Sequence, residues 1–147
     1  MEVFTIGFTR KTAAEFFEIL QKKGIKRLLD VRLNNKSQLA GFTKFTDLKY
    51  FLKKICDIDY MYESKLAPTA MILNEYKKKK GSWEQYEKKF LLLMHERKIE
   101  DKITPSFFTV PTVLLCSETT AEKCHRRLVL EYLKEKWNKT DMKIIHL

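Results

Sequence analysis

Short apolar runs alternate with amphipathic segments along the whole chain. The runs at 26–31 and 112–116 (KRLLDV and TVLLC) are continuously apolar, which is typical of parallel strands buried on both faces. Segment 12–23 instead places its apolar side chains at helical spacing. Strands and helices that alternate in this way form βαβ units with a mostly parallel sheet. We therefore expect a single α/β domain over residues 1–147, with three layers and a sheet of about five strands flanked by helices.

Capping residues mark where several of the expected elements begin. Thr12 with Glu15 and Thr119 with Glu122 fit capping boxes, and Ser82 is placed to cap a long helix. We expect strands at 2–6, 26–31, 58–62, 112–116 and 142–146, and loops at 33–44 and 101–111. Helices are expected at 12–23, 45–55 and 120–137, from Pro68 to a stop at Gly81, and as a long helix that begins after Ser82.

Three segments with small or polar residues lie where an expected strand ends. They are Gly7–Arg10, Asp30–Arg32 and Cys116–Glu118. In open α/β sheets, ligands bind at the carboxyl ends of the strands, near a topological switch point. We therefore expect these segments to share one edge of the sheet and to form the binding site there.

The segment from Cys116 to Arg126 is the strongest candidate for the working part of that site. Cys116 ends an apolar strand, and Cys124, His125 and Arg126 fall in the first two turns of the expected helix at 120–137. A helix N-terminus presents free N–H groups and a partial positive charge, so it attracts anions and lowers the pKa of a nearby thiol. We expect Cys116 to act as a nucleophile or redox thiol and His125 to transfer protons.

The other candidate residues are expected to orient the chemistry or to bind an anion. Glu118 could orient His125 or an arginine, or act as an acid or base, and Cys124 could be a resolving partner. Because buried charges need partners, we expect Asp30 or Arg32 to pair with Arg126 or Glu118 in one network. The catalytic set is Cys116, Glu118, Cys124 and His125, and the anion-binding set is Arg126, Arg32, Gly7, Thr9 and Arg10.

Each of these residues also has an ordinary structural interpretation. Free cysteine is among the most buried residue types, so Cys116 and Cys124 could simply be core residues. A glutamate such as Glu118 is favoured at a helix start by the dipole. Arg126 and Arg127 could form surface ion pairs at helical spacing. The sequence leaves both interpretations open.

The same motifs carry a family resemblance. C-x-E at Cys116–Glu118, C-H-R at Cys124–Arg126, T-I-G at Thr5–Gly7 and D-V-R at Asp30–Arg32 together resemble the domain-of-unknown-function 488 family. The resemblance implies an α/β fold and a functional cysteine pair. It implies no established activity, because the family is named for lacking one. Relatives usually follow T-I-G with His-Ser, whereas this chain has Phe8–Thr9, so any role of that histidine is vacant here.

The net charge of +10 bears on which kind of molecule the protein binds. A strongly basic chain favours a polyanion such as nucleic acid, or an anionic small molecule, although charge also serves solubility. The run Lys77–Lys80 could follow a phosphate backbone, with Tyr60, Tyr62 and Tyr76 stacking on bases. Ordinary solvation of the lysines and packing of the tyrosines is the simpler interpretation.

The apolar runs and the cysteines of the sequence bear on the location of the protein and on metal binding. No signal peptide is visible, and no apolar run approaches the roughly 18 residues that span a bilayer. We expect a cytoplasmic protein without membrane contact. Three cysteines in such a chain argue against a disulfide framework. Structural zinc sites use spacings such as C-x₂₋₄-C, and the wider spacing of Cys116 and Cys124 predicts neither a metal nor a cofactor. The oligomeric state is not indicated.

Three functional hypotheses follow. The leading one is a cysteine-dependent hydrolase or transferase acting on a phosphate-bearing small molecule or a nucleic acid. The motif lacks the glycine-rich C-x₅-R loop of tyrosine phosphatases, so that activity is not assigned. The second is a non-catalytic nucleic-acid-binding module in which the Cys/His/Arg cluster is structural. The third is a redox sensor in which Cys116 and Cys124 form a disulfide.

Overall fold

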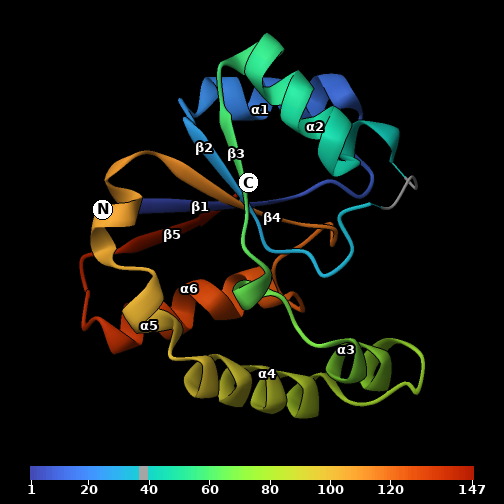
Figure 1. Ribbon diagram of the computed structural model, residues 1–147, viewed down its shortest axis with the longest axis vertical. Coiled ribbons are helices and arrows are strands. Elements are labelled where there is room, and N and C mark those ends of the chain that lie inside the picture. The colour runs from blue at the N-terminus through green and yellow to red at the C-terminus, as the bar shows by residue number, and fades with distance from the viewer. Residues whose placement is uncertain (37–39) are drawn as a thin grey trace.

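A five-stranded parallel sheet forms the centre of the computed structural model, which describes residues 1–36 and 40–147 (Figure 1). Its strand order is β3-β2-β4-β1-β5, and every neighbouring pair is parallel. This confirms the predicted α/β class and the five predicted strands, while the predicted loop at 33–44 lies partly outside the described residues. The strands are β1 (Glu2–Gly7), β2 (Arg27–Asp30), β3 (Asp59–Tyr62), β4 (Thr112–Cys116) and β5 (Lys143–His146).

Helices cover both faces of the sheet (Figure 1). One face carries α1 (Ala13–Lys22) and α2 (Phe45–Phe51), and the other carries α4 (Trp83–Arg97) and α6 (His125–Lys136). The short helices α3 (Ala70–Lys77) and α5 (Ile99–Lys102) pack against α4 and α6 respectively. No helix within 1–36 or 40–147 has the length and apolar character needed to cross a membrane.

Two hydrophobic cores lie on opposite sides of the sheet. Successive side chains of a strand point to opposite faces, so Leu28 and Leu115 pack toward α1 and α2, whereas Leu29 and Leu114 pack toward α4 and α6. All four are at most 1% exposed. Burial on both faces explains why these strands read as continuous apolar runs, and each such side chain contributes about 1.5–3 kcal/mol.

Side-chain caps begin several helices where the sequence places them. The hydroxyl of Thr12 accepts the N–H of Glu15 at 3.1 Å, and that of Ser82 accepts the N–H of Gln85 at 3.2 Å. Gly24 follows α1 with φ of +66°, a conformation that glycine adopts without steric cost. The helix expected from Pro68 begins at Ala70, with Thr69 as its cap.

The last long helix begins later than predicted. The expected capping box of Thr119 and Glu122 does not form, and α6 starts at His125 with Cys124 as its N-cap. The hydroxyl of Thr119 instead donates to a backbone carbonyl of the loop after β1, at 3.5 Å. Residues 119–121 form bends and residues 122–123 a turn, where the sequence predicts the first turn of the helix.

Two other segments also differ from expectation. The predicted loop at 101–111 contains the end of α5 and a 3₁₀ segment at Pro105–Thr109, where proline suits the first helical position. The predicted helix at 45–55 divides after Phe51 into a π-helical segment, Leu52–Cys56.

The connections change face between β1 and β4. The chain leaves β1 through α1 on one face, whereas it leaves β4 through α6 on the other. This is the switch point at which ligands bind in open α/β sheets. Gly7 pairs with Cys116, and Asp30 pairs with Leu115. The three strand ends singled out from the sequence therefore share one edge.

Candidate active site

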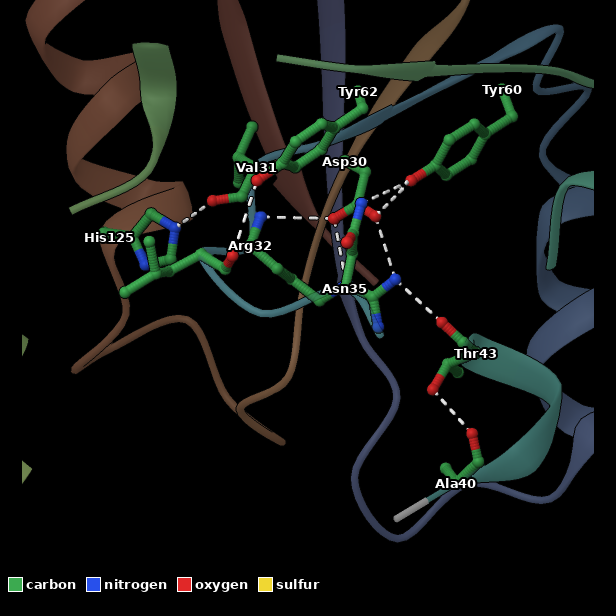
Figure 2. Close-up of polar contacts among 10 residues, drawn as sticks. Asp30, Val31, Arg32, Asn35, Ala40, Thr43, Tyr60, Tyr62 and His125 are labelled. Atoms are coloured by element: carbon green, nitrogen blue, oxygen red, sulfur yellow. Dashed lines mark hydrogen bonds and ion pairs between the residues drawn. The ribbon is translucent and has the colours of Figure 1, made fainter. Parts of the chain in front are cut away.

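Cys116 and His125 meet at the carboxyl end of β4. The Sγ of Cys116 lies 3.6 Å from Nδ1 of His125. The same sulfur lies 3.9 Å from Nε2, and Nε2 lies 2.6 Å from the carbonyl oxygen of Val31 (Figure 2). Because a carbonyl oxygen only accepts, Nε2 donates to it, and Nδ1 is the ring nitrogen nearer to the thiol. The imidazole therefore contacts both the thiol and the backbone carbonyl.

Packing holds this imidazole in place. His125 is the first residue of α6 and is only 6% exposed. The ring of Phe90 from α4 packs against it, with the ring centroids 5.4 Å apart. The ring is therefore fixed by one hydrogen bond and one aromatic contact, and it cannot turn away from Cys116 without losing both.

Arg126 places a positive charge behind the two cysteines. It is 0% exposed, and its Nη1 donates to the carbonyl oxygen of Glu118 at 2.7 Å and lies 3.5 Å from Sγ of Cys124. Its Nε donates to the Thr5 hydroxyl at 3.3 Å. None of the ion pairs in the described part of the chain involves Arg126. Because an uncompensated buried charge is costly, this guanidinium favours a thiolate nearby.

The two buried thiols are shifted in opposite directions. A hydrogen bond from Cys124, then the Ser117 backbone N–H and the Arg126 charge, lower the pKa of Cys116 despite its burial. The pKa of Cys124 is raised well above its usual value, because its thiol proton is held by Cys116 and because it is buried. Cys116 is therefore the more acidic of the two thiols.

A tight backbone approach beside Cys116 requires glycine at position 7. A Cβ on Gly7 would lie 1.6 Å from the carbonyl oxygen of Glu118. Thr9 fastens the same turn, since its N–H and its hydroxyl both donate to the carbonyl oxygen of Ser117, at 3.1 and 2.5 Å. Gly7 thus lets the segment after β4 fold against β1, which sets the position of the Glu118 carbonyl that Arg126 binds.

A second buried network lies at the end of β2 (Figure 2). Asp30 accepts hydrogen bonds from Nε and Nη2 of Arg32, at 2.9 and 2.8 Å, and from the Tyr60 hydroxyl at 2.6 Å. The prediction that Asp30 or Arg32 pairs with Arg126 or Glu118 is wrong. The carboxylate and guanidinium lie two residues apart on one face of the strand end, so they pair with each other.

Burial and the Asp30 carboxylate, in that order, raise the pKa of Tyr60. The phenol therefore stays protonated and remains a donor to the carboxylate. Asn35 in turn donates to the Tyr60 oxygen at 3.3 Å. The network holds Arg32 rigidly at the edge of the sheet.

One nitrogen of Arg32 is left unsatisfied. Nη2 also donates to the carbonyl oxygen of Thr43 at 2.7 Å, but Nη1 is buried and meets no acceptor among the described residues. A buried donor without an acceptor costs about 1–3 kcal/mol.

A cleft of about 340 Å³ opens over Cys116 and His125. Aromatic rings form much of its wall, and two of them, Trp83 and Tyr86, stack at 5.1 Å with 24° between their planes. Cationic side chains also line the cleft. The aromatic lining residues are Phe8, Tyr76, Trp83 and Tyr86, and the cationic ones are Arg32, Lys77 and Lys123.

The structure brings most of the predicted site residues to this cleft. Cys116, Glu118, Cys124, His125, Arg32 and Thr9 line it, whereas Gly7, Arg10, Arg126 and Asp30 are not among its lining residues. Arg10 is exposed, with φ of +64°. Glu118 does not orient the imidazole, because its carboxylate pairs with Lys77 at 2.6 Å and Val31 takes that place.

Sequence reasoning missed several contributors to the site. Trp83 and Tyr86 carry a helical-spacing signal that predicts core packing, and nothing in it distinguishes a cleft wall. Tyr60 stands within a strand-like run, so its bond to Asp30 depends on strand pairing. The Val31 contact uses a backbone carbonyl, which every residue has.

Within residues 1–36 and 40–147, Cys116, Cys124 and His125 form a group that could hold a metal ion. Their ligand atoms all lie within 4.8 Å of one another, and sulfur and imidazole suit zinc. A structural zinc site takes four protein ligands, whereas this group supplies three, a Cys₂His set of the kind with which a catalytic zinc site keeps one position open. The guanidinium of Arg126 lies beside Cys124, and its positive charge opposes a second cation there. The charge of Arg126 is therefore the feature that favours free thiols over a bound metal.

Comparison with known proteins places the chain in a family. A family model described as "Domain of unknown function DUF488" matches residues 12–133. The chain therefore belongs to this family, as the resemblance of its motifs predicts. No curated protein and no solved structure matches the chain. Because the family is one of unknown function, the chemistry follows from the geometry of the site.

Proposed function

We propose that this member of the DUF488 family is a cysteine-dependent hydrolase or transferase that acts on a phosphate-bearing substrate, a nucleotide or a nucleic acid. The observation that carries the proposal is the 3.6 Å contact between Sγ of Cys116 and Nδ1 of His125 inside the cleft. A thiol with a lowered pKa, beside an imidazole and at a strand end, is how cysteine nucleophiles are activated.

The reaction uses these two residues in sequence. Cys116 gives its proton to Nδ1 of His125, and the thiolate attacks the electrophilic atom of the substrate. A sulfur–substrate bond forms, the bond to the leaving group breaks, and the leaving group takes the proton from the imidazolium. Water, in a hydrolase, or a second acceptor, in a transferase, then displaces the thiolate while His125 removes its proton.

The lining of the cleft supports a nucleotide-like substrate. The rings of Tyr76 and Trp83 offer surfaces on which a base can stack, which is worth about 1–3 kcal/mol per base. The cleft-lining residues Arg32, Lys77 and Lys123 offer positive charge to phosphate oxygens. A base would thus contact the aromatic side chains of the cleft, and a phosphate would contact the cationic ones.

Alkylation by iodoacetamide between about pH 5 and 10 tests the nucleophile. We expect Cys116 to react with an apparent pKa below the value of about 8.5 for a free thiol, and His125→Ala to slow the reaction at neutral pH. Cys56 is the control within the same chain, because burial raises its pKa. Identical pH profiles for Cys116 and Cys56 would refute the proposal.

Tryptophan fluorescence tests the ligand. Trp83 lines the cleft, whereas Trp137 lies away from it and packs against Phe108. In a Trp137→Phe protein, a nucleoside monophosphate should quench the remaining indole of Trp83. In the matched Trp83→Phe protein, it should leave the Trp137 emission unchanged. Equal responses of both proteins would count against binding in the cleft.

A non-catalytic nucleic-acid-binding module is the second candidate, favoured by the exposed lysine run Lys77–Lys80 beside the cleft. Such binding weakens steeply with salt. Replacing Lys78, Lys79 and Lys80 by glutamate should abolish retention on single-stranded DNA or RNA at low salt if this candidate holds. The enzyme proposal instead predicts that the Cys116 alkylation profile survives the same change.

A further inference from the structure

A second thiol lies close enough to Cys116 to react with it. The Sγ atoms of Cys116 and Cys124 are within 4.8 Å of each other, and both cysteines are free. Residues 117–123 between them form turns and bends, without helix or strand. A disulfide needs its sulfur atoms about 2.05 Å apart, so the pair can close through movement of this short irregular segment.

The surroundings of the pair suit reduction of a peroxide bond. Cys116 lies 3.6 Å from an imidazole nitrogen that can protonate a leaving oxygen, and it opens to the cleft. Cys124 lies beside it with a guanidinium nitrogen at 3.5 Å from its Sγ. We propose that Cys116 and Cys124 form an attacking and resolving thiol pair that reduces small hydroperoxides.

The reaction balances in two steps. The Cys116 thiolate attacks the terminal oxygen of the hydroperoxide, so a sulfur–oxygen bond forms and the oxygen–oxygen bond breaks. The alkoxide or hydroxide takes a proton from His125 and leaves as an alcohol or water, with Cys116 as a sulfenic acid. The Cys124 thiol then attacks that sulfur, water leaves, and a disulfide remains. The two sulfurs lose two electrons, which the peroxide gains, and an external thiol restores the pair by exchange.

This reaction shares the Cys116 thiolate with the proposed hydrolase or transferase, but it needs no phosphate-bearing ligand. It also requires Cys124 as a reactant, whereas the transfer reaction uses Cys124 only as a donor to the thiolate. The two ideas can therefore fail separately.

Tryptic mass mapping of the whole protein tests the pair directly. Trypsin cuts after Lys102, Lys123 and Arg126, so Cys116 falls in peptide 103–123 and Cys124 in peptide 124–126. After one equivalent of hydrogen peroxide, we expect these two peptides joined, at the sum of their masses less two hydrogens. Reduction with dithiothreitol should separate them.

Two serine variants and an internal control assign the roles. Cys124→Ser should stop at the sulfenic acid of Cys116, which dimedone traps, and Cys116→Ser should form neither product. Cys56, which packs toward the α1 and α2 core on the other side of the sheet, should stay unmodified. With dithiothreitol present, the wild-type protein should consume peroxide at least about tenfold faster than Cys116→Ser.

Some outcomes overturn the inference. One is that Cys56 is oxidised as fast as Cys116. Another is that no disulfide joins peptides 103–123 and 124–126. A third is that the wild type and Cys116→Ser consume peroxide at equal rates. If the link is absent while Cys116 still alkylates with a lowered pKa, the peroxide reaction falls and the proposed transfer chemistry stands. If the link forms but no nucleotide quenches the fluorescence of Trp83, the peroxide reaction stands and the proposed transfer reaction fails.

Discussion

Replacing Gly7 by alanine should damage both the fold and the site, because the space for a side chain is already taken. The new Cβ would lie 1.6 Å from the carbonyl oxygen of Glu118 and 2.7 Å from its carbonyl carbon. To reach a separation of even 3.0 Å, the oxygen has to retreat by about 1.4 Å. The obstacle is backbone, so no side-chain rotation relieves it.

The cost has two parts. Forcing extra atoms into packed structure costs about 1–3 kcal/mol. Moving the Glu118 carbonyl also stretches the 2.7 Å hydrogen bond from Nη1 of Arg126, and a hydrogen bond to a charged group contributes about 1.5–3 kcal/mol. The register of β1 with β4 holds Gly7 opposite Cys116, so the strand cannot slide away. We expect Gly7→Ala to lower the free energy of unfolding by about 2.5–6 kcal/mol.

Urea unfolding followed by tryptophan fluorescence and circular dichroism measures this loss. Gly41→Ala is the matched control, since Gly41 has no positive φ and no described atom within 4 Å of its Cβ position. Its stability should stay equal or rise by about 0.4–1 kcal/mol. A Gly7→Ala protein within about 1 kcal/mol of the wild type would refute the steric reasoning. Where Gly7→Ala is only partly destabilised, Cys116 should also lose its lowered pKa in alkylation.

Two further changes probe the charged groups of the site. Tyr60→Phe should lower the free energy of unfolding by about 1.5–3 kcal/mol, because the carboxylate of Asp30 loses a hydrogen-bond donor. Tyr62→Phe is the control, since the Tyr62 hydroxyl makes an exposed 3.4 Å contact, and it should change this free energy by less than about 0.5 kcal/mol. Equal losses of stability for the two variants in urea titrations would contradict this prediction. Cys116→Ser should be destabilised relative to the wild type mainly at high pH. The pKa of Cys116 in the folded protein lies below its value in the unfolded chain. The thiolate therefore contributes stability that is fully present above about pH 8.5 and is lost as pH falls through the lowered pKa. If the urea midpoints of the wild type and Cys116→Ser differ by the same amount at every pH, the prediction of a buried thiolate is wrong.

The layout of the fold and the edge that carries the site could be predicted because both depend on local pattern. Continuous apolar runs mark strands buried on both faces, and parallel strands place their carboxyl ends together. Once strand 112–116 is assigned, Cys116 has to lie at that edge. Gly7 lies opposite Cys116 in the sheet, as sharing this edge requires.

The pairings within the site could not be predicted, since they depend on distances between elements. Thr119 and Glu122 satisfy the pattern of a capping box, yet the Thr119 hydroxyl binds the loop after β1 and the helix begins at His125. Asp30 pairs with Arg32 rather than with Arg126, because the nearer partner lies on the same strand end. Sequence spacing gives the residue types at an edge, and only the packed elements decide which of them touch.

Arg126 connects the reactivity of the site with its reversibility. Its buried guanidinium has no carboxylate partner in residues 1–36 and 40–147, and its charge is one of the causes that lower the pKa of Cys116. In the proposed disulfide with Cys124, the sulfur of Cys116 would carry no negative charge, so the buried cation would lose that compensation, which is costly. The charge of Arg126 would therefore favour reduction of the disulfide back to the thiolate, as turnover of the proposed peroxide reaction requires.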